Sequence, residues 1–352
     1  MRVLITGVTS FLGLYTAKLL LQEGHEVIGA VRPGSRRAQE LDAHGISAYP
    51  TYRTVHLDLS ELPEAELGEA HYAEVLGLDG AAAPAHSAAP VVAAQPLATR
   101  LPSPALADEP APLIDAWVHF AWDGVGSAGR SDTNIQIENI QNAKKAYLYA
   151  KLLGARKFLF AGSQAEYGIG NHRVPMPVSP YGKAKLSFGR WATEQSLLSE
   201  LYDDAPMQFI HMRIYSVYGS GDHETSLVNT VLRAALRHEA ITLGPCEQRW
   251  NYLEVHDLAR AIRILLRSED TRTGIYDIAG SDSRMLKKYV IAMNSIAGNG
   301  AELRFGTRAN NAEGAANMSP EILKLQRLGF HQEISFEAGI GMLLKMMREE
   351  LS

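Results

Sequence analysis

Short apolar runs alternate along the chain with longer segments whose apolar residues recur at helical spacing. RVLIT at residues 2–6 is β-branched and ends at Gly7, as a buried strand does. FLGLYTAKLLLQ at 11–22 has helical spacing and ends before Gly24. The strands predicted in this way are 2–6, 25–31, 53–59, 117–122, 157–162 and 208–214, and a long helix is predicted over 133–153. Strands that alternate with helices indicate an α/β fold with a doubly wound parallel sheet.

The pattern changes after residue 220. A helical segment at 227–239 is followed by short strands and helices, and the chain ends in an amphipathic segment at 336–351. We therefore expect two domains. The first spans 1–220, and the second, a smaller α/β domain, spans 221–352, with some segments returning to the first. The second would cover the carboxyl edge of the sheet, where ligands of such sheets bind.

One segment breaks the alternation of strands and helices. Residues 60–116 separate the third and fourth predicted strands, whereas a crossover between parallel strands needs only about a dozen residues. Of the 32 residues at 81–112, 12 are alanine and 7 are proline. Frequent proline prevents a continuous helix. We expect a loosely ordered surface insertion at about 78–113; a functional lid is the alternative.

Composition and charge exclude several classes of protein. The 352 residues are 46% hydrophobic and carry a net charge of -5, so no basic field points to nucleic acid or to an anionic membrane. The single cysteine, Cys246, cannot form an internal disulfide. The chain starts directly with a strand, and no apolar run reaches the roughly 20 residues of a membrane helix. We expect a cytoplasmic protein that binds no metal.

The loop after the first strand has the features of a dinucleotide site. In TGVTSFLG, residues 6–13, glycines allow the backbone to approach a pyrophosphate, and the following helix offers its N–H groups. Ser10 stands where a third glycine would, and a plain tight turn is the alternative. The residues predicted to bind the cofactor here are Gly7, Thr9, Ser10, Phe11, Leu12 and Gly13.

The end of the second strand favours NADP. An acidic residue there would bind the ribose hydroxyls of NAD, but the chain has Val31, followed by Arg32 and, nearby, Arg36. Guanidinium groups suit a 2′-phosphate, although these arginines would also suit a solvated loop, and NAD remains the alternative. After the third strand, Asp58 and Leu59 are predicted to lie against the adenine; Asp58 would equally suit a helix cap.

Three residues have the types needed for proton transfer. Ser163 follows the strand at 157–162, and Tyr181 and Lys185 lie four apart in a predicted helix, hence on one face. A nearby ammonium stabilises a phenolate, and a phenol beside it can then act as acid or base near neutral pH. A Tyr–Lys pair is common by chance, but a strand-end serine and a dinucleotide loop in the same chain make it informative.

With these motifs in place, the chain resembles the extended short-chain dehydrogenase/reductases, the nucleotide-sugar epimerase/dehydratase family. The resemblance covers nearly the whole chain except the Ala/Pro segment. The residues that carry it are TGVTSFLG, VHFAW (118–122), Asn139, GSQAEYG (162–168), Tyr181, Lys185, MRIYSVYG (212–219) and WNYLEVHDLARA (250–261).

The resemblance implies a Rossmann-type sheet and hydride exchange between a nicotinamide and a sugar carbon. Ser163 would position the substrate oxygen, Tyr181 would transfer the proton, and Lys185 would hold the nicotinamide ribose and tune Tyr181. Asn139 would support the helix geometry around Lys185. Phe120, Ala121 and Trp122 would lie beside the cofactor, and a homodimer is expected.

The chain departs from the dehydratases of that family. An Asp–Glu pair follows the serine or threonine in those enzymes, whereas Gln164 and Ala165 stand here and neither can act as acid or base. Glu166 is one position too late. Dehydration is therefore disfavoured, and 4-keto reduction or C4 epimerisation is expected. Arg32 tilts the choice towards reduction, which draws on NADPH.

The expected substrate contacts also differ from the family pattern. Trp250 and Asn251 replace an Arg–Asp pair whose arginine grips the substrate diphosphate in many members, and Arg249 comes one residue early. The predicted substrate-binding residues are Asp123, Gln164, Arg249, Trp250 and Arg308. Asp257 is expected to cap the helix that follows. A reductase of a non-sugar carbonyl and a non-catalytic dinucleotide sensor remain the other hypotheses.

Overall fold

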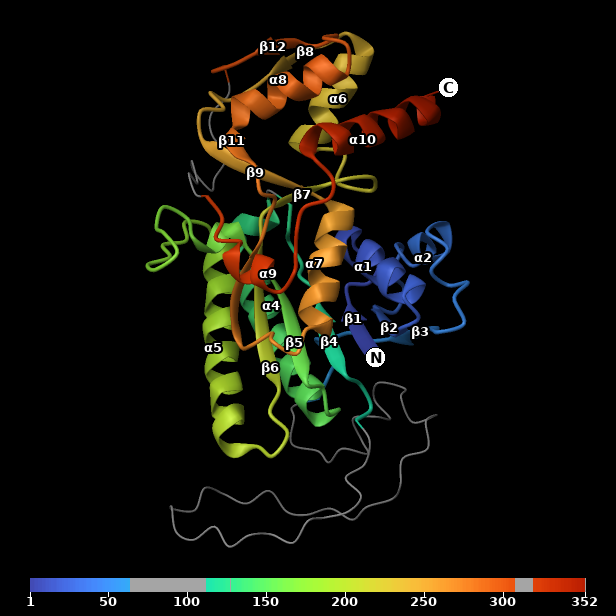
Figure 1. Ribbon diagram of the computed structural model, residues 1–352, viewed down its shortest axis with the longest axis vertical. Coiled ribbons are helices and arrows are strands. Elements are labelled where there is room, and N and C mark those ends of the chain that lie inside the picture. The colour runs from blue at the N-terminus through green and yellow to red at the C-terminus, as the bar shows by residue number, and fades with distance from the viewer. Residues whose placement is uncertain (64–111, 127, 308–318, 352) are drawn as a thin grey trace, which may run out of the picture.

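The computed structural model describes residues 1–63, 112–126, 128–307 and 319–351 (Figure 1). The predicted insertion at 78–113 lies outside the described residues except for its last two. The strands are β1 Arg2–Thr6, β2 Glu26–Val31, β3 Tyr52–His56, β4 Ala116–His119, β5 Lys157–Ser163, β6 Gln208–Ile214, β7 Ser216–Tyr218, β8 Ala240–Thr242, β9 Arg249–Glu254, β10 Gly274–Ile278, β11 Ser283–Met285 and β12 Glu302–Arg304. The helices are α1 Phe11–Gln22, α2 Gln39–Ala43, α4 Thr133–Leu152, α5 Pro180–Tyr202, α6 Leu227–Arg237, α7 Val255–Arg267, α8 Leu286–Ile296, α9 Leu323–Arg327 and α10 Phe336–Leu351, with short 3₁₀ helices η1 Gly129–Ser131 and η2 Gln164–Glu166.

Seven strands form one parallel sheet in the order β10-β6-β5-β4-β1-β2-β3. β1 lies between β2 and β4: Val3 pairs with Val27 of β2 on one side and with Ala116 of β4 on the other. This confirms the predicted α/β fold and its six strands. The seventh, β10, was not predicted. The expected strands at 53–59 and 117–122 are wrong at their ends, because β3 stops at His56 and β4 stops at His119.

Helices cover both faces of this sheet (Figure 1). On one face, apolar side chains of α1, α7 and α9 belong to one cluster with alternate residues of the strands, such as Val3 and Ile5 of β1. On the other, α4 and α5 pack against Leu4 and the aromatic residues of β5, Phe158 and Phe160. Because successive side chains of a strand point to opposite faces of the sheet, each strand contributes to two apolar cores, one on each face. In the described part of the chain, no helix is both long and apolar enough to cross a membrane.

Besides the two cores of the sheet, a separate apolar cluster, named the second cluster, lies among the elements beyond the carboxyl edge, which occupy the upper part of Figure 1. It joins α6, α8 and α10 to aromatic residues such as Tyr252 and Phe336. Smaller sheets, β11-β9-β7 and β12-β8, belong to this part. Residues after 220 also return to the large sheet as α7, β10 and α9. The division at residue 220 stays a prediction.

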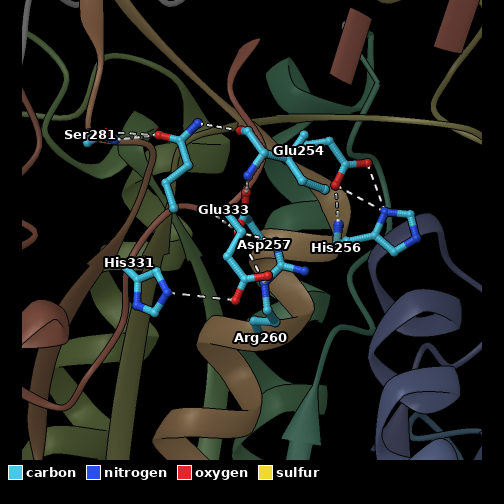
Figure 2. Close-up of polar contacts among 9 residues, drawn as sticks. Glu254, His256, Asp257, Arg260, Ser281, His331 and Glu333 are labelled. Carbon is cyan, nitrogen blue, oxygen red and sulfur yellow. Dashed lines mark hydrogen bonds and ion pairs between the residues drawn. The ribbon is translucent and has the colours of Figure 1, made fainter. Parts of the chain in front are cut away.

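Asp257 holds the chain around 333–334 against α7, as Figure 2 shows. The expectation that it caps this helix is wrong: Glu254 is the cap, and its carboxylate accepts the N–H of His256 at 2.7 Å. Asp257 is fully buried and accepts the N–H groups of Glu333 at 3.0 Å and Ile334 at 2.9 Å. It also pairs with Arg260. One carboxylate therefore satisfies two backbone donors far away in the sequence.

Replacing this carboxylate destabilises the fold. Asp257→Ala leaves two buried N–H groups without their acceptor and leaves Arg260 with its pair to Glu333, so we expect the free energy of unfolding to fall by about 3 kcal/mol. Urea denaturation at pH 7 measures it. Glu333→Gln is the control, since the half-exposed Glu333–Arg260 pair is worth no more than about 1 kcal/mol. Equal losses in both variants would contradict the role given to Asp257.

Candidate active site

A cavity of about 830 Å³ lies at the carboxyl edge of the sheet. Its wall combines residues that follow β1, β2, β4 and β5 with residues of the second cluster. It brings together most of the predicted site residues, namely Gly7, Thr9, Ser10, Phe11, Leu12, Arg32, Asp58, Leu59, Phe120, Ala121, Trp122, Asp123, Asn139, Ser163, Gln164, Tyr181, Lys185 and Trp250. Gly13, Arg36 and Arg249 do not line it, and Arg308 lies outside the described residues.

The loop after β1 fits a dinucleotide. Gly7 has a φ of +74°, and a Cβ on it would lie 2.8 Å from the backbone N of Ala121. A Cβ on Gly13 would lie 2.3 Å from the carbonyl oxygen of Gly7. Gly13 is thus needed for packing rather than for lining. Ser10 caps α1 by accepting the N–H of Gly13 at 3.1 Å, which accounts for a serine where a glycine was expected. The remaining N–H groups at the start of α1 suit a phosphate.

Arg32 and Asp123 form a two-point ion pair at the cavity wall. The guanidinium nitrogens of Arg32 donate to the two carboxylate oxygens of Asp123 at 3.0 and 2.9 Å, and both side chains are more than half exposed. Because β1 lies between β2 and β4, the pair spans the end of β1. A predicted cofactor residue and a predicted substrate residue are therefore bound to each other.

The neighbouring polar residues differ in part from the prediction. Ser35 and Arg37 line the cavity, whereas Arg36 does not. Asp58 accepts the hydroxyl and N–H of Ser60 at 2.7 and 2.9 Å. The hydrogen bond from the Ser60 hydroxyl is the main reason that the pKa of Asp58 lies below its ordinary value. Asp58 also lines the cavity.

Asn139 fixes the segment that follows β4. Its amide nitrogen donates to the carbonyl of Asp123 at 2.9 Å, and its amide oxygen accepts the N–H of Asp123 at 2.9 Å. These bonds hold the chain after β4, and the expected support of the helix around Lys185 stays a prediction. Neighbouring Gln136 accepts the indole N–H of Trp122 at 2.8 Å. Two amides of α4 thus set the conformation of residues 122–123.

Tyr181 and Lys185 lie one turn apart at the start of α5. Ser179 caps this helix and accepts the N–H of Gly182 at 3.1 Å. The ammonium of Lys185 is 5.6 Å from the centre of the Tyr181 ring and donates to the carbonyl of Ala161 at 2.7 Å. Burial lowers the pKa of Lys185 well below its ordinary value. The guanidinium of Arg130 lies 4.6 Å from the centre of the Tyr181 ring, so a second cation adjoins the phenol.

Ser163 is held by a buried carboxylate that sequence reasoning left without a role. The N–H of Ser163 donates to Glu166 at 2.8 Å, and its hydroxyl oxygen accepts the N–H of Ala165 at 3.2 Å. Glu166 is fully buried and pairs with His211 and Arg213, each at 2.9 Å. The S-x-x-E spacing of a capping box would have revealed this turn.

Only some of the residues predicted to bind the substrate line the cavity. Gln164 reaches the hydroxyl of Ser216 at 3.5 Å, and Trp250 lines the cavity. Arg249 instead donates to the carbonyl of Ser283 at 2.8 Å. Asn251 binds backbone groups of Gly280 and Asp282 and so fixes the turn after β10. Asp222, His223 and Ser226 also line the cavity, as does Gln248, which sequence reasoning missed.

Comparison with known proteins agrees with this arrangement. The sequence profile of the NAD dependent epimerase/dehydratase family matches residues 3–90 and 65–279. The chain belongs to that family. It is therefore an enzyme of NAD-dependent epimerase/dehydratase type, and its cofactor is a nicotinamide dinucleotide. The individual roles of the site residues stay predictions.

Several known enzymes are similar to this chain in sequence or in fold. CDP-abequose synthase of Yersinia pseudotuberculosis is 25% identical over 202 residues, which is 56% of this chain and 68% of that protein. UDP-glucose 4-epimerase of Thermotoga maritima, solved with UDP-glucose, has a TM-score of 0.74 at 17% identity, with both chains fully covered. UDP-glucuronic acid 4-epimerase of Bacillus cereus, solved with UDP-glucuronic acid and NAD, also has a TM-score of 0.74 at 17% identity, over 99% of this chain and 100% of that one. The two structures establish that the fold is shared.

Glu166 gives a test that depends on pH. Burial raises the pKa of this carboxyl, but His211, Arg213 and the N–H of Ser163 outweigh burial and hold the pKa below its ordinary value. An unfolded glutamate titrates near pH ~4.3. As the pH falls below that value, the unfolded chain takes up a proton first, so the contribution of Glu166 to stability is lost.

We therefore expect Glu166→Gln to lower the free energy of unfolding by about 3 kcal/mol at pH 7 and by progressively less below pH ~4.3. Urea denaturation across pH 3–7, a range set by that titration, measures the difference. Glu138→Gln, at an exposed position of α4, is the matched control and should change stability by less than about 0.5 kcal/mol. A difference that does not vary with pH would contradict the ionised state of Glu166.

Proposed function

We propose that the enzyme reduces a 4-keto group, or epimerises C4, of a nucleotide-linked deoxysugar. The observation that carries the proposal is the common cavity of Ser163, Tyr181 and Lys185 with the glycine loop after β1. A cavity of about 830 Å³ has room for a second ligand beside a dinucleotide's reactive end. The nucleotide sugars in the names of the similar enzymes support this class of substrate.

The side chains have the chemistry that the reaction needs. When bound, the nicotinamide exchanges a hydride with the sugar carbon. Tyr181 gives its phenolic proton to the C4 oxygen during reduction and takes it back in the opposite direction. The ammonium of Lys185 stabilises the phenolate that remains. Ser163 holds the C4 oxygen of the sugar by a hydrogen bond. The residues that would hold the dinucleotide are the loop 7–13, Arg32 and Asp58.

The carboxylates are not placed for dehydration. Gln164 and Ala165 follow Ser163, and Glu166, the nearest acid, is fully buried in its pairs with His211 and Arg213. It does not line the cavity. Elimination of water needs an acid and a base at the sugar, and neither is available beside Ser163. This favours reduction or epimerisation.

Two other hypotheses keep specific support. No arginine stands at 250–251, where many members grip a diphosphate, and this leaves room for a reductase of a non-sugar carbonyl. Trp250 and Tyr252 line this part of the cavity and would suit stacking on a base or on another flat ligand. A dinucleotide sensor would retain binding without Tyr181-dependent turnover.

The homodimer that the family resemblance implies stays a prediction. Exposed apolar side chains of α4 and α5, namely Ile137, Leu197, Leu198 and Leu201, would suit such a contact.

The substrate class is tested by adding a panel of nucleotide-linked sugars and 4-keto-6-deoxysugars to the enzyme with NADPH or NADH. We expect one compound to cause stoichiometric loss of absorbance at the nicotinamide band, or to isomerise without net loss. Tyr181→Phe should lower kcat by about 10²–10⁴, since it removes the proton donor. Product analysis separates reduction from epimerisation.

Each outcome of the panel decides between hypotheses. Turnover of a non-sugar carbonyl alone would overturn the sugar assignment. Cofactor binding without any turnover that depends on Tyr181 would favour the sensor. Formation of a 4-keto-6-deoxy product from a 6-hydroxy sugar would contradict the argument from Gln164 and Ala165.

Preference for NADP is tested at Arg32. If its guanidinium leaves Asp123 to bind a 2′-phosphate, Arg32→Met should weaken NADPH binding about tenfold or more and NADH binding little, because a charge-assisted bond is lost only with NADPH. Fluorescence titration with both cofactors measures this. Arg36→Met, an exposed arginine outside the cavity wall, is the matched control. Equal weakening of both cofactors would contradict 2′-phosphate recognition.

A further inference from the structure

The ammonium of Lys185 lies in an almost closed environment. Its side chain is buried, and its nitrogen lies 3.7 Å from the centre of the Trp122 ring and 4.8 Å from that of Phe160. The ammonium has three N–H donors, and it donates to the carbonyl of Ala161 at 2.7 Å. Aromatic faces take the place that water would have around this cation.

The indole of Trp122 is held independently of Lys185. Its N–H donates to Gln136 at 2.8 Å, and the amide of Gln136 in turn donates to the carbonyl of Gly129 at 2.9 Å. Gln136 is itself almost fully buried. The ring also contacts Phe160, with centres 5.7 Å apart. The face of the ring is therefore already oriented before the cation meets it.

We propose that Trp122 is a positioning residue for Lys185: the indole face, tethered to α4 through Gln136, keeps the ammonium charged and directed at the site of Tyr181. The inference rests on the proposed function and adds to it a residue that acts through Lys185. A cation over tryptophan is favoured most among the aromatic residues, and the more so where water is excluded. The ring offers this stabilisation without placing a negative charge beside the reacting oxygen.

Other charged groups near Lys185 also affect whether its ammonium keeps its proton. Glu166, beneath the turn after β5, favours the ammonium, whereas Arg130 of η1 opposes it. Burial, and then the charge of Lys185, lower the pKa of His119 of β4 to about 3, so His119 stays neutral. Burial is the largest effect and lowers the pKa of Lys185. The indole face attracts the ammonium, so we expect its loss to lower the pKa of Lys185 further.

The first experiment compares pH–rate profiles of the wild type, Trp122→Leu and Trp122→Phe. Activity needs the ammonium, so a lower pKa of Lys185 brings the alkaline limb to lower pH. We expect a shift of about one pH unit for Trp122→Leu and a smaller one for Trp122→Phe, which retains an aromatic face. A purely structural role would lower kcat at every pH and leave the limb in place.

Trp191 supplies a matched control. It lies on α5, and its ring is 5.2 Å from the ammonium of Lys144 on α4, outside the cavity wall. Trp191→Leu therefore removes a tryptophan–lysine contact of the same kind without touching Lys185. The alkaline limb of this variant should coincide with that of the wild type. A shift as large as that of Trp122→Leu would overturn the proposal.

The second experiment needs no substrate and no cofactor. The tryptophan fluorescence of the free protein is titrated from neutral to alkaline pH, and the profile of Trp122→Phe is subtracted. We expect an inflection below the pH ~10.4 at which an ordinary lysine titrates, and its absence in Lys185→Met. No inflection, or one unchanged in Lys185→Met, would overturn the contact even if the enzyme proves active. An inflection without any turnover would support the contact and count against the proposed function alone.

Discussion

Parallel pairing of the strands is the constraint on which the site depends. Every strand of the large sheet ends at the same edge, so the residues just after β1, β2, β4 and β5 meet there although up to about 150 positions separate them in the chain. The backbone approach between Gly7 and Ala121 holds two of these ends in contact. A side chain at residue 7 would separate them and widen the floor of the cavity. The cavity that holds Ser163, Tyr181 and Lys185 therefore depends on this packing condition.

The sequence allowed much of this arrangement to be predicted, for identifiable reasons. Periods of two and 3.6 residues report burial directly, so six strands and the long helices were found. The glycine loop and the Tyr–Lys pair are local patterns. β10 was missed because it has five residues and follows a part of the chain already assigned to another domain. Asp257 was misassigned because its partners, the N–H groups of 333 and 334, carry no sequence signal.

The side-chain partners within the site could not be predicted at all. Arg32 and Asp123 are 91 positions apart, and each was assigned to a different ligand because neither pattern refers to the other. Asn139 binds the chain after β4, a partner that no local pattern indicates. Glu166 is the instructive exception. Its spacing from Ser163 is a local signal of a turn, whereas its pairs with His211 and Arg213 have no local signal. Contacts with residues far away in the sequence set the role of such residues. A local sequence pattern predicts only which part of the fold they lie in.

The Arg32–Asp123 pair has a consequence for how a dinucleotide is selected. A guanidinium bound to a carboxylate presents a dipole to the solvent rather than a net charge, and a dipole attracts a distant phosphate only weakly. In a chain with a net charge of -5, long-range attraction of an anionic cofactor is weak in any case. Selection between two cofactors then takes place after the encounter, when the pair can exchange partners. Discrimination by Arg32 would thus be expressed in how long a cofactor stays and not in how often it arrives.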